Sequence, residues 1–136
     1  MRNRHYWCIS RQRCWGTPIP VFFRQDGSAV VGQDIIDAIA QRIEQHDADI
    51  WWQLDANTLF PAELRDKYGI GADEKLEKSH DIMDVWMDSG MAWSATRDRP
   101  DEQVDLVVEG GDQFRGWFQS LALTSQAITV SFRSRR

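Results

Sequence analysis

The stretch VDLVVEGGDQFRGWF, residues 104–118, carries the strongest fold signal in this chain of 136 residues. Three successive apolar residues, Leu106 to Val108, predict a strand that is buried on both faces. The glycine pair that follows predicts a turn, and Asp112 is a good N-cap for a helix. Apolar side chains then recur at helical spacing as far as Ile128. We therefore predict an α/β core in which 104–108 is a central parallel strand and 112–128 its following helix.

Shorter patterns precede this stretch. The runs 19–23 and 29–31 flank an Asp-Gly pair and predict a β-hairpin. The segment 33–44 predicts a helix. Its apolar face would carry Ile35, Ile36, Ile39, Ala40 and Ile43. Pro61 predicts the start of another helix, which would run through Tyr68 and end at Gly69.

The segment 82–87 is strand-like, and residues 88–90 predict a turn after it. On a strand, Asp84, Trp86 and Asp88 would share one face, because side chains alternate with a period of two. The resulting acidic patch would be either a solvated surface or part of a cleft. The spacing alone leaves both interpretations open.

Composition excludes several classes of protein. Hydrophobic residues make up 42% and charged residues 27%, which is globular composition. The net charge of -5 disfavours a stand-alone nucleic-acid binder, because phosphate binding needs clustered cations. No membrane span or secretory signal is evident, so we expect an intracellular protein with both thiols free. Cys8 and Cys14, with His5 as the nearby extra candidate, do not supply a zinc ligand set, so no metal site is predicted.

The residues between the predicted strand and helix are candidates for ligand binding. In open α/β sheets, ligands bind at the carboxyl ends of strands, where helix N-termini offer free N–H groups. Glu109, Asp112 and Gln113 could then accept hydrogen bonds from ribose hydroxyls or an amine. The alternative is that Asp112 only caps the helix and the glycines only form the turn. Likewise, Trp86 and Trp117 could be either core residues or pocket walls.

Three ordered motifs resemble one enzyme family. They are WCISRQRCWG at 7–16, DVWMDSG at 84–90 and EGGDQFRGWF at 109–118. The first is similar to the class I aminoacyl-tRNA synthetases of the isoleucine, valine and leucine group. The third is similar to the isoleucyl type and differs from the valyl and leucyl sequences. The resemblance covers residues 4–129, and Met87 stands where the isoleucyl family typically has Phe.

The resemblance implies a fold and a set of binding residues. Residues 1–130 would form the second half of a Rossmann-type nucleotide-binding fold, which is incomplete here, and 131–136 an unrelated tail. Residues matching the adenylate-binding motif are Glu109, Gly111, Asp112 and Gln113. Residues matching the walls of the isoleucine pocket are Trp86 and Trp117. No catalytic side chain is implied, because isoleucine attacks the α-phosphate of ATP directly and catalysis comes from positioning and electrostatics.

The implied partners of the parent enzyme are isoleucine, ATP with Mg²⁺, and tRNA(Ile), in the mitochondrial matrix or the bacterial cytoplasm. The family's HIGH-type and KMSKS-type motifs, which supply most of the positive groups for the phosphates, do not occur among these 136 residues. We therefore expect the chain alone to be inactive. Two alternatives stay open: a non-catalytic truncated product or interaction module, and a fragment of a valyl- or leucyl-type synthetase.

Overall fold

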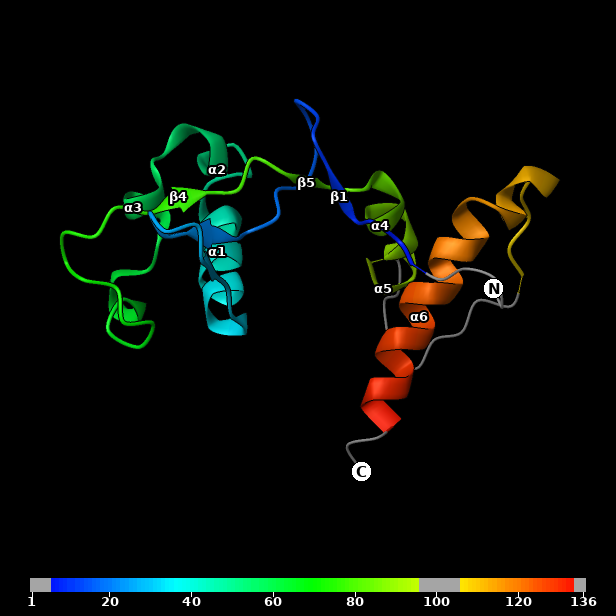
Figure 1. The fold of residues 1–136 in the computed structure, drawn as a ribbon. Coiled ribbons are helices and arrows are strands. Elements are labelled where there is room, and N and C mark those ends of the chain that lie inside the picture. Colours follow the sequence, from blue (N-terminus) through cyan, green and yellow to red (C-terminus); the bar gives the residue numbers. More distant parts are fainter. Residues whose placement is uncertain (1–5, 96–105, 134–136) are drawn as a thin grey trace. The chain divides into compact units, whose positions relative to one another are not determined.

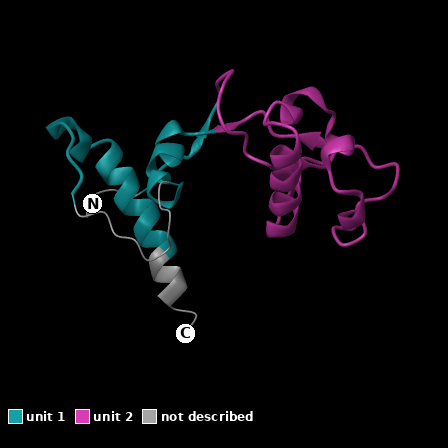
Figure 2. Cartoon of the chain, turned by 180° about the vertical axis from the view of Figure 1, so that it is seen from behind, with its two compact units in different colours: residues 1–11, 83–136 teal, residues 12–82 magenta. Residues whose placement is uncertain are grey.

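The computed structural model describes residues 6–95 and 106–133 (Figure 1). The chain forms two compact units, which Figure 2 colours separately. The insert unit consists of residues Gln12–Ile82, and the split unit combines Met1–Arg11 with Met83–Arg136. The chain therefore leaves the split unit once, builds the insert unit and then returns.

A three-stranded antiparallel sheet organises the insert unit. Its strand order is β3 (Ala29–Val30), β2 (Phe22–Phe23), β4 (Glu77–Lys78). Phe22 pairs with Val30 on one side and with Lys78 on the other. The predicted hairpin is confirmed, and Gly27 has the positive φ of 81° that its turn requires.

The predicted helix is also confirmed as α1 (Gln33–Gln45). Ile35 and Ile39 are buried, and Ile43 packs against the core. Ile36 and Ala40 are exposed, so the predicted apolar face is too wide. Ile36 lies about 100° around the helix from Ile35, which turns it away from the buried stripe.

Short helical turns follow α1: α2 (Ile50–Gln53), α3 (Ala56–Leu59) and the 3₁₀ helix η1 (Ala62–Leu64). The helix predicted from Pro61 through Tyr68 is therefore wrong in length. Arg65 Nη2 donates to the backbone oxygens of Gly71 and Glu74, each at 2.7 Å, and these bonds hold a loop rather than further helical turns. Gly69, with φ of 62°, ends the segment as predicted.

The core of the insert unit is aromatic. Phe22 packs edge-on against Trp51 and Phe60, with ring centroids 5.4 and 5.1 Å apart. All three side chains are fully buried. The Trp51 indole donates to the backbone oxygen of Ser79 at 3.1 Å, so its one polar group is satisfied inside the core.

The split unit contains mainly helices. They are α4 (Val85–Gly90), α5 (Ala92–Ala95), the 3₁₀ helix η2 (Gly111–Phe114) and α6 (Trp117–Arg133). The strand β1 (Ser10–Arg11) pairs with β5 (Ile82–Met83), in which the chain passes from the insert unit back to the split unit. The strand predicted over 82–87 is wrong beyond Met83. Asp84 caps α4 by accepting a bond from the Trp86 backbone N–H, so Trp86 and Asp88 lie on a helix and the predicted shared strand face does not form.

The central strand predicted over 104–108 is not found. Residues 106–108 have no strand pairing and are exposed, with 78% of Leu106 and 78% of Val108 accessible. Residues 104 and 105 lie outside the described part of the chain. A strand buried on both faces needs neighbouring strands and a covering layer, and the described residues place neither beside this run.

The helix predicted over 112–128 is largely confirmed, although its start differs. Asp112 lies inside η2 rather than at the cap of the long helix. Gln113 takes the capping role, because its Oε1 accepts a bond of 3.0 Å from the backbone N–H of Trp117, the first residue of α6. The regular helix therefore begins five residues later than the sequence pattern indicates.

Candidate functional site

A polar pocket of about 250 Å³ lies within the split unit, next to the start of α6. Residues from three segments of the chain line it: Trp7, Arg11, Asp84, Trp86, Arg115, Gly116 and Ser120. The pocket therefore combines cationic, anionic and aromatic side chains. Of the predicted site residues, it contains Trp86.

Asp84 connects several parts of this pocket, and it is only 5% exposed. Its Oδ2 accepts hydrogen bonds from Trp7 Nε1 at 2.8 Å and from Arg11 Nη2 at 2.9 Å. Its Oδ1 faces the backbone N–H of Trp86 at 3.4 Å. The Asp84 backbone N–H donates to the Ile9 carbonyl oxygen at 2.7 Å, so both backbone and side chain join the two segments.

Gly116 lies where Trp86 and Gln113 meet. A Cβ atom on this glycine would be 3.0 Å from Trp86 Cη2 and 2.9 Å from Gln113 Oε1. Gln113 is itself oriented from both ends, because its Nε2 donates to Asp112 Oδ2 at 3.2 Å while its Oε1 caps α6. The absence of a side chain at 116 thus allows an aromatic ring and an amide to approach the start of α6.

Helix α4 is fixed against α6 through its last carbonyl groups. The Trp117 indole donates to the Ser89 carbonyl oxygen at 2.8 Å, and the Thr124 hydroxyl donates to that of Gly90 at 2.5 Å. The backbone approach is close, since a Cβ on Gly90 would be 3.1 Å from the Ser120 backbone. These contacts bind carbonyl groups at the C-terminal end of α4 to side chains of α6.

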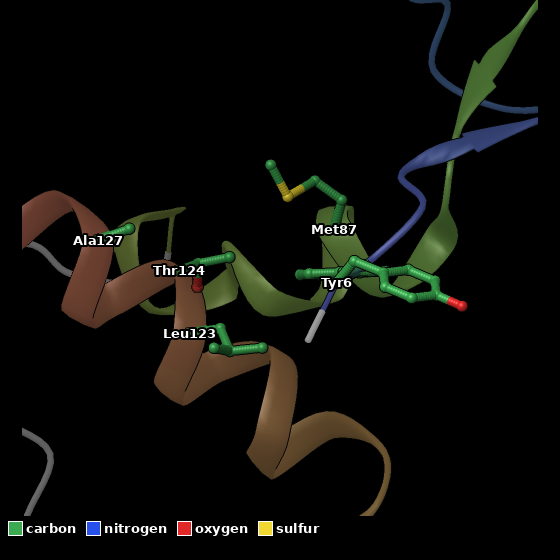
Figure 3. A pocket seen from close by; sticks show the side chains of 6 residues that line it. Tyr6, Met87, Leu123, Thr124 and Ala127 are labelled. Carbon is green, nitrogen blue, oxygen red and sulfur yellow. The ribbon is translucent and has the colours of Figure 1, made fainter. Parts of the chain in front are cut away.

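A second, apolar pocket of about 360 Å³ lies on the same unit (Figure 3). Its lining residues are Tyr6, Trp7, Met87, Leu123, Thr124 and Ala127. Met87 comes from α4, and Leu123, Thr124 and Ala127 come from α6. Trp7 therefore lies between the apolar pocket and the polar one.

The predicted site residues are only partly brought together. Trp86 and Gln113 meet at Gly116, and Trp117 directly follows this glycine. Glu109, Gly111 and Asp112 are exposed, and neither pocket includes them among its lining residues. Trp117 lines neither pocket, because its indole is turned to the carbonyl of Ser89.

Sequence reasoning misses the roles of Trp7, Arg11 and Thr124. Trp7 and Arg11 reach Asp84 across 77 and 73 residues of sequence, so no local period connects them. A signal exists only in the motifs, since both residues belong to the first of the three family-like segments. Nothing in the sequence indicates that Thr124 bonds the end of α4.

The described residues contain no group of three or more His, Cys, Asp or Glu side chains that could hold a metal ion. Cys8 and Cys14 are exposed, free thiols. The Ser10 hydroxyl lowers the pKa of Cys8, with smaller effects from the Ser10 backbone and from Arg11. Within residues 6–95 and 106–133, no helix is long and apolar enough to cross a membrane.

Residues 1–132 match the family described as tRNA synthetases class I (I, L, M and V). The chain therefore belongs to the class I tRNA synthetases. This membership confirms the resemblance that the three motifs indicate.

Individual relatives indicate which type of class I synthetase this chain is similar to. The chain is 45% identical over 130 residues to the mitochondrial isoleucine–tRNA ligase of Macaca fascicularis, an alignment that covers 93% of this chain and 13% of that protein. It is 42% identical over 131 residues to the isoleucine–tRNA ligase of Streptococcus mutans, covering 94% and 14%. It is 44% identical over 130 residues to that of Prochlorococcus marinus, covering 93% and 13%. The chain thus spans about one seventh of the length of these relatives.

Proposed function

We propose that this chain forms the amino acid and ribose side of the catalytic site of an isoleucine-specific tRNA synthetase. The observation that carries the proposal is the meeting of Trp86 and Gln113 at Gly116, in a chain of the class I family. The names of the relatives support isoleucine over the other amino acids of the family. In such an enzyme the product of the first step is isoleucyl-adenylate, and the acyl group then passes to tRNA(Ile).

The proposed roles follow from the chemistry of each side chain. Glu109 and Asp112 are exposed acceptors that suit ribose hydroxyls or an ammonium group. Gly111 leaves open space beside its backbone, because no neighbouring atom lies within 4 Å of the point where a Cβ would stand. Gln113 is held by Asp112 and by the Trp117 N–H, and so presents a fixed amide. Trp86, which lines the polar pocket, would wall the aliphatic side chain of isoleucine. Trp117 would support this wall from behind, because its indole is bonded to the Ser89 carbonyl oxygen.

No protein nucleophile is required by this reaction. The isoleucine carboxylate attacks the α-phosphate, and pyrophosphate leaves. The chain's own contribution would be to orient the amino acid and the ribose, which lowers the entropic barrier of a bimolecular step. Arg115, exposed beside the polar pocket, is the cation there that makes no ion pair among the described residues.

ATP enters as a substrate with Mg²⁺ by analogy with the family. The described residues offer the carboxylates of Glu109 and Asp112, before and within η2, but no metal-binding cluster, so we assign no step to the ion. Among the described residues, Arg115 is the cation of the polar pocket without an ion pair, and it could face the triphosphate. We propose that further cations for the triphosphate come from other parts of a full-length enzyme. We propose a Rossmann-type second half for the parent fold, and a mitochondrial or bacterial setting from the relatives' sources.

The test uses a hybrid enzyme in which residues 1–132 replace the matching segment of the Streptococcus mutans relative. We expect ATP–pyrophosphate exchange that depends on isoleucine. Parallel assays with valine, leucine and methionine measure specificity. Stronger exchange with valine or leucine would support the alternative synthetase types, and a folded hybrid without any exchange would support a non-catalytic module.

A further inference from the structure

Asp84 joins the two segments of the split unit where the chain departs and returns. Arg11 is the last residue before the insert unit, and Asp84 is the second residue after it. The bond of 2.9 Å between Arg11 Nη2 and Asp84 Oδ2 is an ion pair whose carboxylate side chain is only 7% exposed. Because the carboxylate is buried, water and salt screen this ion pair less than a pair in which both side chains are exposed.

The number of donors around Asp84 exceeds what a helix cap needs. Oδ1 alone can accept the Trp86 N–H at the start of α4. Oδ2 accepts two further donors, the Trp7 indole and the Arg11 guanidinium. An asparagine caps helices equally well. An asparagine amide has a single acceptor oxygen, however, and its other end is an NH₂ donor. This NH₂ group would face either the Trp86 N–H or the two donors of Trp7 and Arg11, and could accept from none of them.

Arg11 is also held in place by its own segment of the chain. Its Nη1 donates to the carbonyl oxygens of Cys8 at 2.6 Å and Ser10 at 2.8 Å. The guanidinium is therefore bound on both nitrogens by its own segment and by the carboxylate. The three bonds fix the planar guanidinium in one orientation, because its donors form a rigid fork.

The network ends at Trp86. Its backbone N–H is bonded to Asp84, and its ring lies over Gly116 in the pocket that Trp7, Arg11 and Asp84 also line. We propose that Asp84, held by Trp7 and Arg11, is a positioning residue that sets the Trp86 ring in the amino acid pocket. This inference rests on the proposed function, because it assigns the ring a substrate to contact.

The kinetic test compares Asp84→Asn with the unchanged hybrid enzyme in isoleucine-dependent exchange. We expect KM for isoleucine to rise on the order of tenfold, since misplacing a positioning group by about an ångström can cost up to about 100-fold. A merely structural role would reduce the amount of folded enzyme, which lowers the apparent kcat and leaves KM unchanged. That second result would overturn the proposal.

Arg11→Gln provides a second variant that keeps the carboxylate and the helix cap. We expect it also to raise KM for isoleucine. Because both residues act through one ion pair, the double variant should raise KM by less than the product of the two single effects. Independent, multiplicative effects would show that Asp84 and Arg11 do not act together and would contradict the proposal that Arg11 holds Asp84 in place.

A spectroscopic test on the 136-residue chain separates this inference from the proposed function. With ¹⁵N-labelled tryptophan, Asp84→Asn should shift the signals of Trp7 and of Trp86, whereas Asp66→Asn, at an exposed carboxylate of the insert unit, should leave them in place. If the hybrid does not activate isoleucine but Trp86 shifts, the proposed function fails and the positioning role stands. Unchanged Trp86 signals in Asp84→Asn would refute the positioning role.

Discussion

Asp34 shows how one side chain can make the stability of the insert unit depend on pH. It lies in the first turn of α1 and accepts hydrogen bonds from Lys67 Nζ at 2.7 Å and from the Tyr68 hydroxyl at 2.5 Å. These two bonds, that of Lys67 first, lower the pKa of Asp34 from 3.8 to about 2. A helix N-terminus also favours a negative charge at this position.

The folded state binds the Asp34 proton more weakly than the unfolded state. The carboxylate therefore contributes stability above pH 3.8, and this contribution is lost as the pH falls towards about 2. We expect Asp34→Asn to be less stable than the unchanged chain at pH 6, with the difference shrinking between these two pKa values. Urea denaturation across this pH range measures it. A difference that does not change with pH would contradict the assigned pKa.

Trp51 supports a second prediction at the residue scale. Its side chain is fully buried, and its indole N–H is bonded to the Ser79 carbonyl oxygen. Trp51→Phe keeps an aromatic ring but leaves that oxygen without its donor. We expect a loss of about 1–3 kcal/mol in the free energy of unfolding. Trp52→Phe is the matched control, because Trp52 is 37% exposed and its substitution should change stability by less than about 0.5 kcal/mol.

The sequence predicts individual residues well where local patterns decide their environment. Ile35 and Ile39 follow the helical period into the core, and Gly27 and Gly69 have the positive φ that their turns require. The local pattern places Asp84 on a strand, whereas the structure has Asp84 as the N-cap of α4. Its partners Trp7 and Arg11 are distant in sequence, and only the folded chain brings them together.

At the scale of elements, the contact between α4 and α6 organises the split unit. The segment Val85–Met87 has a β-favouring composition, which explains why the sequence predicts a strand there. The Asp84 cap and the close packing on α6 outweigh this local preference. The run at 106–108 also has a strand propensity, but it stays exposed because no strand among the described residues pairs with it.

Gly90→Ala tests this contact. In an exposed helix the substitution would stabilise the chain by about 1 kcal/mol. Here a Cβ would be 3.1 Å from the backbone carbonyl group of Ser120, so crowding should dominate and destabilise the split unit by about 1–3 kcal/mol. Hydrogen exchange of the α4 and α6 amides measures the effect. Gly71→Ala, whose Cβ would have its nearest neighbour at 3.9 Å, is the control.

At the scale of the whole molecule, the family is predictable from the sequence and the complete site is not. Three motifs indicate a class I synthetase, and the family match over residues 1–132 confirms it. The central parallel strand depends on neighbours that the described chain does not provide, so an apolar run alone could not establish it. The role of Glu109 could not be established from the sequence either, because this exposed side chain is proposed to act on a ligand.

The 136 residues alone should not catalyse isoleucine-dependent pyrophosphate exchange. Arg115 is the one cation of the polar pocket without an ion pair among the described residues, while Glu109 and Asp112 would repel a triphosphate. Losing even one group that stabilises transition-state charge costs about 100- to 1,000-fold in rate. Exchange assays on the purified chain, beside the hybrid enzyme, measure this. Clear exchange by the chain alone would contradict the prediction.

The insert unit begins and ends at neighbouring points, because Gln12 Nε2 donates to Asp81 Oδ1 at 3.0 Å and Ile19 N donates to the Asp81 carbonyl oxygen at 3.0 Å. When the insert unit is folded, these bonds therefore keep its two ends together, and with them the flanking residues Arg11 and Met83 of the split unit. When it unfolds, the same residues become a slack loop of roughly 70 residues, whose closure costs about 4 kcal/mol of chain entropy. Melting the aromatic core around Phe22 should thus loosen the Asp84 network without touching any atom of it.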